Sequence, residues 1–130
     1  MFWANSQIFE NRYRVKGDWV YILDDDDFLT DYTFIQSLKQ VVADNDIVIC
    51  KGYIGKPLYP SIWEEVPVRA TIGSPNFIVK KELFLKHADK WIVPRAGDFF
   101  FINAAYENAK VYWWDKIVFT APIGSGMPEK

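Results

Sequence analysis

The sequence predicts an α/β fold built on a mixed, mostly parallel sheet with flanking helices, and three segments carry that prediction. Residues Trp19–Leu23 form a continuous apolar run of strand length. Apolar residues recur at helical spacing over Thr30–Ala43, and Ile47–Cys50 is a second apolar run. Strand, amphipathic helix and strand in this order make a β-α-β unit, whose two strands run parallel.

The elements of the N-terminal half have clear local signals. A helix is predicted over residues 5–16, with Asn5 or Ser6 as its N-cap and Gly17 as its stop. The run Trp19–Leu23 has no polar residue, which is typical of a central strand covered on both faces. The helix over Thr30–Ala43 takes Thr30 or Asp31 as its cap.

The C-terminal half continues with shorter elements. Residues 52–68 contain three prolines among aromatic residues, a composition that predicts an ordered but irregular surface segment. Beyond it we expect strands at 76–79, 111–114 and 117–119, helices from Lys80 or Lys81 to Ala88 and over 98–108, and a loose tail from Pro122. No internal repeat or change in composition divides the chain, so residues 1–130 are expected to form a single domain.

Composition excludes several classes of protein. The formal net charge of -2 argues against a nucleic-acid partner, because phosphate backbones require a basic surface. No apolar stretch approaches the roughly 20 residues that span a bilayer, so no transmembrane segment is expected. A lone cysteine, Cys50, leaves no internal disulfide and favours a cytoplasmic location.

Four consecutive aspartates, Asp24 to Asp27, follow the first apolar run directly. Carboxylates at the end of a buried strand stand where α/β sheets bind ligands, and they are the ligands that Mg²⁺ or Mn²⁺ prefer. In an extended chain Asp24 and Asp26 share one side, and Asp25 and Asp27 share the other. The cluster therefore predicts a metal-assisted phosphate site, although a solvated loop or a favourable charge at the next helix would use the same residues.

The segment Lys16–Leu29 resembles the G-(D/E)-(Y/W)-hhhh-L-D-x-D-D motif of GT-A glycosyltransferases, particularly family 2, where h is an apolar residue. The resemblance implies a partial GT-A, Rossmann-like fold and a nucleotide-sugar donor bound through Mn²⁺ or Mg²⁺. It places Asp24 near the ribose or the metal, gives Asp26 the metal, and lets Asp27 assist.

Two downstream segments resemble the same family. Gly73–Phe84 is similar to its small-residue loop, strand and helix, and Ala96–Phe101 stands in place of its E-D-x-x-(F/L) segment. The resemblance makes Asp98 the catalytic general base of an inverting enzyme, which takes a proton from the hydroxyl of a carbohydrate or other acceptor. Gly97 replaces the usual Glu, and a helix N-cap is the structural alternative for Asp98.

The motif h-h-h-P-x-(Y/F)-N that opens the family's fold has no counterpart here, so the chain is expected to be the C-terminal portion of a GT-A-like domain. Such a sheet would expose an edge, which a homo-oligomer would cover. Two functions therefore stay open: a metal-dependent glycosyltransferase, or a noncatalytic remnant that binds a metal, a sugar or a protein. Trp63 and Trp91 are candidates for sugar stacking, with core packing as the alternative.

Overall fold

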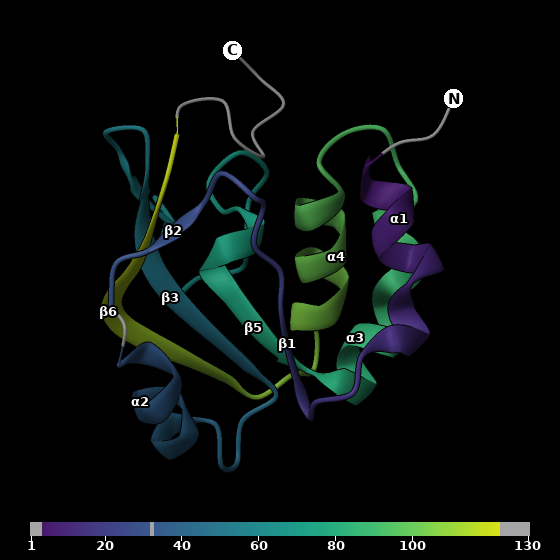
Figure 1. Ribbon diagram of the computed structural model, residues 1–130, viewed down its shortest axis with the longest axis horizontal. Coiled ribbons are helices and arrows are strands. Elements are labelled where there is room, and N and C mark those ends of the chain that lie inside the picture. Colours follow the sequence, from purple (N-terminus) through teal and green to yellow (C-terminus); the bar gives the residue numbers. More distant parts are fainter. Residues whose placement is uncertain (1–3, 32, 123–130) are drawn as a thin grey trace.

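The computed structural model describes residues 4–31 and 33–122 (Figure 1). Its helices are α1 (Ala4–Glu10), α2 (Phe34–Val41), α3 (Lys81–His87) and α4 (Gly97–Tyr106), with 3₁₀ turns η1 (Arg12–Arg14), η2 (Ser74–Asn76) and η3 (Ala88–Trp91). Its strands are β1 (Trp19–Tyr21), β2 (Phe28–Leu29), β3 (Ile47–Ile54), β4 (Leu58–Tyr59), β5 (Phe77–Lys80) and β6 (Val111–Ala121).

The strands form one mixed sheet in the order β1-β5-β3-β6-β2, with β4 paired to β3 as well. Among the described strands, only the β3–β6 pair is parallel, so the prediction of a mostly parallel sheet is wrong. The strands of the predicted β-α-β unit, β1 and β3, do point the same way. They are not neighbours, because β5 lies between them and pairs antiparallel with both.

Alternating side chains bury both faces of the sheet. Ile47 and Ile49 of β3 face a core that includes Phe84 of α3 and Phe101 of α4, and α1 packs against the same core. The intervening residues of β3 face a second core, which contains Phe34 of α2. The result is three layers, with α1, α3 and α4 on one face of the sheet and α2 on the other (Figure 1).

The strand β1 is at the end of the described strand order, so its predicted central position is wrong. Its apolar composition has another cause: Val20 packs against one core while Trp19 and Tyr21 pack against the other. Both faces of a strand can therefore be covered even when the strand pairs with only one neighbour in the sheet. The edge of β1 away from β5 has no partner among the described strands.

Several element boundaries differ from the prediction. The first helix is interrupted at Asn11, and Asn5 and Ser6 lie within it rather than at its cap. The first strand stops at Tyr21, and the α2 helix starts only at Phe34, with Thr33 as its N-cap. Instead of capping, the Asp31 carboxylate accepts hydrogen bonds from the backbone nitrogen and the hydroxyl of Thr33 at 2.9 and 2.7 Å.

The segment predicted as irregular, residues 52–68, begins inside the sheet. The strand β3 runs on to Ile54 and turns back into β4, so the regular part is longer than its prolines suggest. The two predicted C-terminal strands are one strand, β6, whose register against β3 shifts around Lys51. At this irregularity the Lys51 ammonium pairs with the Asp115 carboxylate at 2.8 Å. The predicted loose tail lies outside the described residues beyond Pro122.

Within the described part of the chain, no helix has the length and apolar character needed to cross a lipid bilayer.

Candidate functional site

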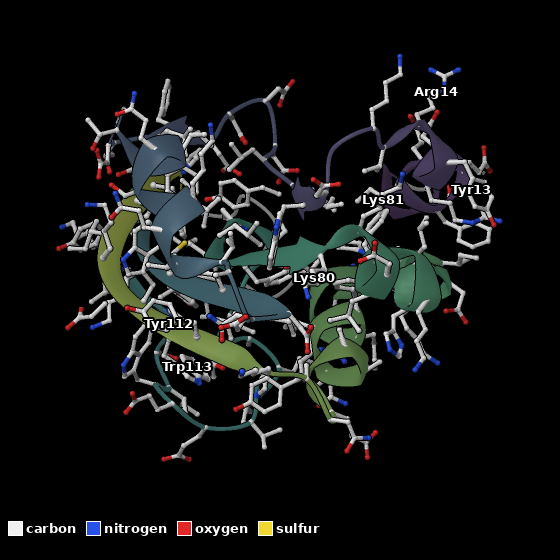
Figure 2. The ribbon with its side chains drawn as sticks, turned by 90° about the horizontal axis from the view of Figure 1, so that it is seen from below. Tyr13, Arg14, Lys80, Lys81, Tyr112 and Trp113 are labelled. Atoms are coloured by element: carbon white, nitrogen blue, oxygen red, sulfur yellow. The ribbon has the colours of Figure 1, made fainter. Side chains whose placement is uncertain are left out.

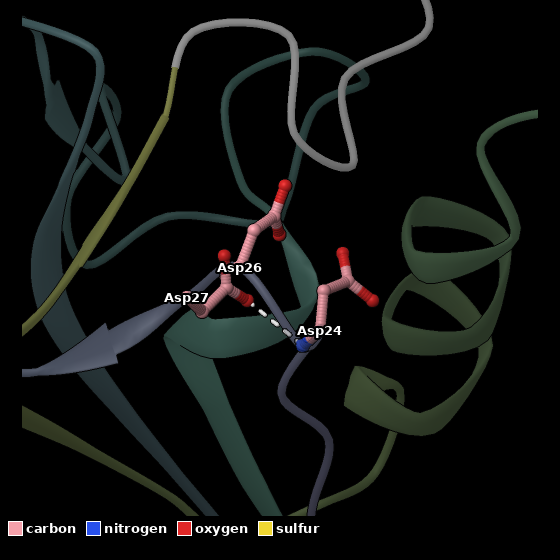
Figure 3. Close-up of side chains that lie close together, drawn as sticks. All are labelled: Asp24, Asp26 and Asp27. Atoms are coloured by element: carbon pink, nitrogen blue, oxygen red, sulfur yellow. Dashed lines mark hydrogen bonds between the residues drawn. The ribbon is translucent and has the colours of Figure 1, made fainter.

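The four aspartates form a tight turn between β1 and β2 rather than an extended segment. The Asp27 amide donates to the Asp24 carbonyl at 3.1 Å, and the Asp24 amide donates to Oδ2 of Asp27 at 2.9 Å (Figure 3). This folding back brings the side chain of Asp27 to the same side as Asp24. In an extended strand the side chains of Asp24 and Asp27 would point to opposite sides, so the predicted separation of these two carboxylates is wrong.

The turn gathers three carboxylates and leaves Asp25 out of the group. One oxygen from each of Asp24, Asp26 and Asp27 lies within 4.8 Å of the others. Opposite ligands of a Mg²⁺ ion stand about 4.2 Å apart, so small side-chain rotations would let the three oxygens share one hard cation. Their chemistry and spacing fit a Mn²⁺ or Mg²⁺ ion.

The electrostatics of the turn also favour a cation. Desolvation by the surrounding chain raises the pKa of Asp24, and the negative charges of Asp27, Asp26 and Asp25 raise this pKa further. A positive ion among these oxygens would remove that repulsion. In Figure 3 the Asp24 carboxylate lies on the side of the turn that faces α4.

The second predicted residue, Asp98, lies in the first turn of α4. The N-cap of this helix is Ala96, so the alternative reading of Asp98 as the N-cap is wrong. Ala96 has a left-handed backbone with φ of 59°, and it is the buried one among the described non-glycine residues with positive φ. The sharp turn at Ala96 directs the chain into α4, and the Phe99 amide then donates to Oδ1 of Asp98 at 2.8 Å.

Burial makes Asp98 an unusually basic carboxylate. Only 8% of the residue is exposed, and its desolvation raises its pKa from 3.8 to about 6. The charge of Asp24 raises this pKa as well, while hydrogen bonds from backbone amides, Phe99 first, oppose the shift. A carboxylate with this pKa is largely ionised near neutral pH and accepts a proton more readily than an ordinary aspartate.

One small cavity is lined by both predicted parts of the site, the acidic turn and Asp98. It has a volume of about 60 Å³, and both Asp24 and Asp98 line it. Ile8, Ile22, Ser74, Trp91, Ala96 and Gly97 complete its wall. The structure therefore brings together the acidic turn and the predicted base, which are far apart in the sequence.

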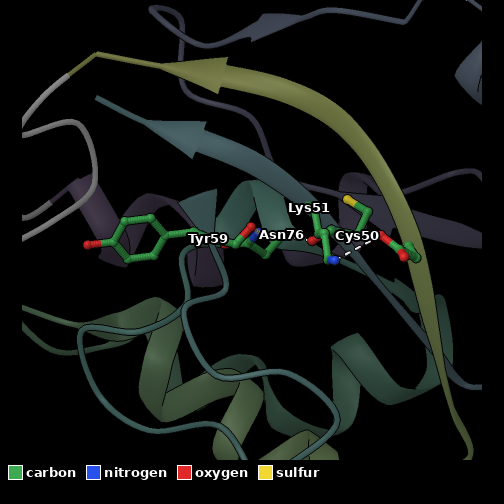
Figure 4. Close-up of polar contacts among 5 residues, drawn as sticks. Cys50, Lys51, Tyr59 and Asn76 are labelled. Atoms are coloured by element: carbon green, nitrogen blue, oxygen red, sulfur yellow. Dashed lines mark hydrogen bonds and ion pairs between the residues drawn. The ribbon is translucent and has the colours of Figure 1, made fainter. Parts of the chain in front are cut away.

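The loop beside this cavity is held in place by Asn76, which was predicted only as the first residue of a strand. Asn76 is fully buried, and its Nδ2 donates to the carbonyls of Cys50 and Tyr59, each at 2.9 Å (Figure 4). Its Oδ1 accepts the Gly73 amide at 2.9 Å. Asn76 thereby ties the Gly73–Ser74 loop to β3 and β4. The sequence signal for this role was a polar residue directly before the apolar run Phe77–Val79.

Buried polar residues concentrate at this end of the molecule. Among the described residues, the buried polar or charged ones are Ser74, Asn76 and Asp98. Such residues reduce stability unless they are satisfied or used. Their concentration beside one cavity marks it as the candidate functional site.

The two tryptophans predicted as stacking candidates have packing roles. Trp91 is 2% exposed and stacks on Phe101 with ring centroids 5.6 Å apart. Trp63 packs edge-on against Trp113 at 5.0 Å and carries the Lys51 ammonium over its face at 4.4 Å. Trp91 therefore has no exposed face for sugar stacking, and one face of the half-buried Trp63 ring is covered by Lys51.

A larger hollow of about 450 Å³ lies at the other end of β5, between α3 and α4. Lys80 lines it where β5 meets α3 (Figure 2). The Lys80 ammonium pairs with the Asp46 carboxylate at 3.4 Å. The other charged side chains around it have both signs. This hollow has no buried polar side chain among the described residues, so size alone does not make it the site.

Comparison with known proteins adds one finding. No protein-family model matches the chain, and no curated protein sequence matches it. A crystal structure of S. aureus TarS 1-349, a glycosyltransferase, superposes with a TM-score of 0.70 at 20% identity, over 92% of this chain and 40% of that one. The chain has a glycosyltransferase-like fold.

A second crystal structure of S. aureus TarS gives the same result. Its TM-score is 0.67 at 19% identity, and the match covers 91% of this chain and 24% of TarS. The chain thus spans less than half of either neighbour. At these identities the likeness concerns the fold, and the chemistry has to be argued from the site.

Proposed function

We propose that this chain carries the metal and base portion of a GT-A glycosyltransferase of the family 2 type. It would transfer a sugar from a nucleoside-diphosphate sugar to an acceptor hydroxyl, with inversion at the anomeric carbon. The observation that carries the proposal is the cavity shared by the acidic turn, through Asp24, and the buried carboxylate of Asp98.

The carboxylates have separate roles in this reaction. Asp24, Asp26 and Asp27 would hold the Mn²⁺ or Mg²⁺ ion, which neutralises the charge of a leaving diphosphate when bound. Asp98 accepts the proton of the acceptor hydroxyl, whose oxygen then forms a bond to the anomeric carbon. The bond from that carbon to the diphosphate breaks on the opposite face, so the configuration inverts.

The environment of Asp98 supports its role as the base. Its raised pKa, about 6, lies close to neutral pH, where a general base combines a large ionised fraction with useful proton affinity. The ion pairs of a simple structural carboxylate would lower its pKa, as Lys116, followed by Thr33, lowers the pKa of Asp31 to about 2. For Asp98 the largest effect is burial, which raises its pKa instead of lowering it.

Nucleotide binding tests the metal part of the proposal. Isothermal titration of UDP and GDP, each with and without Mn²⁺, should show binding that requires the metal. Asp26→Ala should weaken that binding at least about tenfold because it removes one of three charged ligands, while the matched variant Asp25→Ala should leave it unchanged. Metal-independent binding, or equal affinity in the Asp26 variant, would contradict a catalytic site. Sugar binding without any metal-dependent nucleotide binding would favour the noncatalytic alternative.

A further inference from the structure

A single hydrogen bond connects the strand before the acidic turn to the loop beside Asp98. The hydroxyl of Tyr21 donates to the carbonyl of Pro75 at 2.7 Å, although the two residues are 54 positions apart in the sequence. Tyr21 is the last residue of β1 and comes shortly before Asp24, the first residue of the acidic turn. Pro75 lies in η2, directly after Ser74, which lines the cavity with Asp98. The bond therefore joins the two parts of the candidate site.

The loop that contains Pro75 lies against the predicted base. A methyl group built on Gly73 would be 3.8 Å from Oδ2 of Asp98, so the backbone of the loop passes close to this carboxylate. Burial raises the pKa of Asp98 most, while hydrogen bonds from the backbone amides of Phe99 and Ser74 oppose that rise. Because the Ser74 amide donates to the carboxylate, a displacement of the loop would move or reorient Asp98.

The Tyr21 hydroxyl makes its connection at the point where the sheet stops. The pairing of β1 with β5 ends at Tyr21, which lies opposite Ile78. In the same register, the next residues would bring Asp24 opposite Pro75, but β1 has ended by then and the chain enters the acidic turn. Beyond the last pair of the ladder, the side chain of Tyr21 thus continues the link between β1 and η2.

The other contacts around this bond leave the connection to the hydroxyl. The Tyr21 ring packs on Phe34 with centroids 5.4 Å apart, and a phenylalanine would fill the same space. The Cys50 thiol approaches the Pro75 carbonyl at 3.6 Å, but a thiol is a weak donor. Asn76 holds the loop to β3 and β4. The Tyr21 hydroxyl therefore holds the same loop from the side of β1.

We propose that Tyr21 is a positioning residue that fixes Asp98 relative to the acidic turn. Its hydroxyl acts through the Pro75 carbonyl, which holds the loop against the carboxylate. This inference rests on the proposed function, in which the turn holds the metal ion and Asp98 is the base. The separation of these two groups sets the distance between the leaving diphosphate and the acceptor hydroxyl, on which the rate depends. A cation bound by the turn then perturbs Asp98 through the loop as well as directly across the cavity.

Magnesium binding to the ¹⁵N-labelled chain tests this connection by NMR. Mg²⁺ should shift the amide resonances of the acidic turn saturably. With the same dissociation constant it should shift the amides of Ser74 and Phe99, which donate to Asp98. In Tyr21→Phe the shifts of these two amides should fall by at least about half, because only the direct electrostatic effect of the ion remains. The affinity of the turn for Mg²⁺ should change less than about threefold, because the hydroxyl is not a metal ligand.

Two further variants separate the hydrogen bond from the packing of the ring. Replacing Tyr21 by 4-aminophenylalanine keeps the ring and returns an N–H donor to the Pro75 carbonyl, so the shifts of Ser74 and Phe99 should recover. Tyr53→Phe removes the hydroxyl of an exposed tyrosine on β3 and should leave both the shifts and the affinity unchanged. A hydrogen bond with a purely structural role would lower the urea midpoint of Tyr21→Phe and leave the magnesium response as in the wild type.

The outcomes separate this inference from the proposed function. The inference is overturned if Ser74 and Phe99 do not respond to Mg²⁺ in the wild type, or if Tyr21→Phe keeps the full response. It is also overturned if the aminophenylalanine variant fails to restore a lost response. Metal-dependent binding of UDP or GDP would still support the proposed function in these cases. A magnesium response that depends on Tyr21, without any nucleotide binding, would keep the positioning role and remove the transferase.

Discussion

Replacing Asp98 by asparagine should stabilise the protein in a pH-dependent way. The buried carboxylate has a pKa of about 6 in the folded chain, against 3.8 as its ordinary value. Its protonated form therefore favours the folded state. The stability contribution of this proton is complete below pH 3.8 and is lost as the pH rises through about 6.

The magnitude follows from this difference. Because one pKa unit corresponds to about 1.4 kcal/mol, the rise from 3.8 to about 6 lowers the free energy of unfolding by about 3 kcal/mol at pH 8. At pH 5 the same linkage gives a loss of about 1.5 kcal/mol, because Asp98 is then mostly protonated in the folded state only. An asparagine does not titrate, so the advantage of Asp98→Asn over the wild type should grow by about 1.5 kcal/mol between pH 5 and pH 8.

Urea denaturation in EDTA at the two pH values measures this difference. Any cost of fitting the amide is the same at both, so it cancels when the two comparisons are subtracted. Asp25→Asn, on the exposed part of the acidic turn, is the matched control and should change the free energy of unfolding by less than about 0.5 kcal/mol at either pH. A gap between wild type and Asp98→Asn that is constant with pH, or that shrinks toward pH 8, would refute the assignment of a buried, destabilised carboxylate.

Three further substitutions, one of them with a matched control, test the architecture by urea denaturation. Asn76→Asp puts a carboxylate oxygen against two carbonyls now bound at 2.9 Å, and should cost about 3–5 kcal/mol; a loss below 1 kcal/mol would contradict the buried hydrogen bonds. Gly52→Ala forces a methyl group into the Phe119 ring and should lower the free energy of unfolding by about 1–3 kcal/mol. In the control Gly17→Ala the nearest contact of the new methyl group is at 3.7 Å, so the loss should be far smaller. Equal losses in the two variants would count against the packing of β3 on β6. Ala96→Gly releases the left-handed strain at φ of 59° but adds chain entropy and removes a buried methyl group. The free energy of unfolding should therefore change by less than about 1 kcal/mol, and a loss above about 2 kcal/mol would show that this backbone is unstrained.

The sequence predicted the elements that carry the candidate site better than it predicted the pairing of the strands. The apolar run before Asp24 and the helix at Asp98 are local signals, and both elements exist where expected. No local signal says that β5 lies between β1 and β3, because the two outer strands point the same way whether or not a strand separates them. Strand pairing is set by contacts across the whole sheet, which periodicity alone does not encode.

The details of the site depend on the same long-range contacts. Asp27 joins the acidic group through a hydrogen bond within the turn, which the alternation of an extended strand does not predict. The burial of Asp98, and of the Trp91 indole nitrogen that has no partner within the described part of the chain, appears only once distant segments pack together. The single-domain organisation, the cytoplasmic location and the self-association at the edge of β1 stay predictions.

Three residues that line the cavity each have a feature that lowers the stability of the fold. Together these features argue for a functional site independently of any family resemblance. Ala96 has a left-handed backbone, Asp98 is a buried carboxylate with a raised pKa, and the indole nitrogen of Trp91 has no hydrogen-bond partner among the described residues. Each lowers stability and each could be removed by one substitution, so a site selected only for packing would not retain all three. Strained and unsatisfied groups that share one wall are instead expected where a ligand completes the structure.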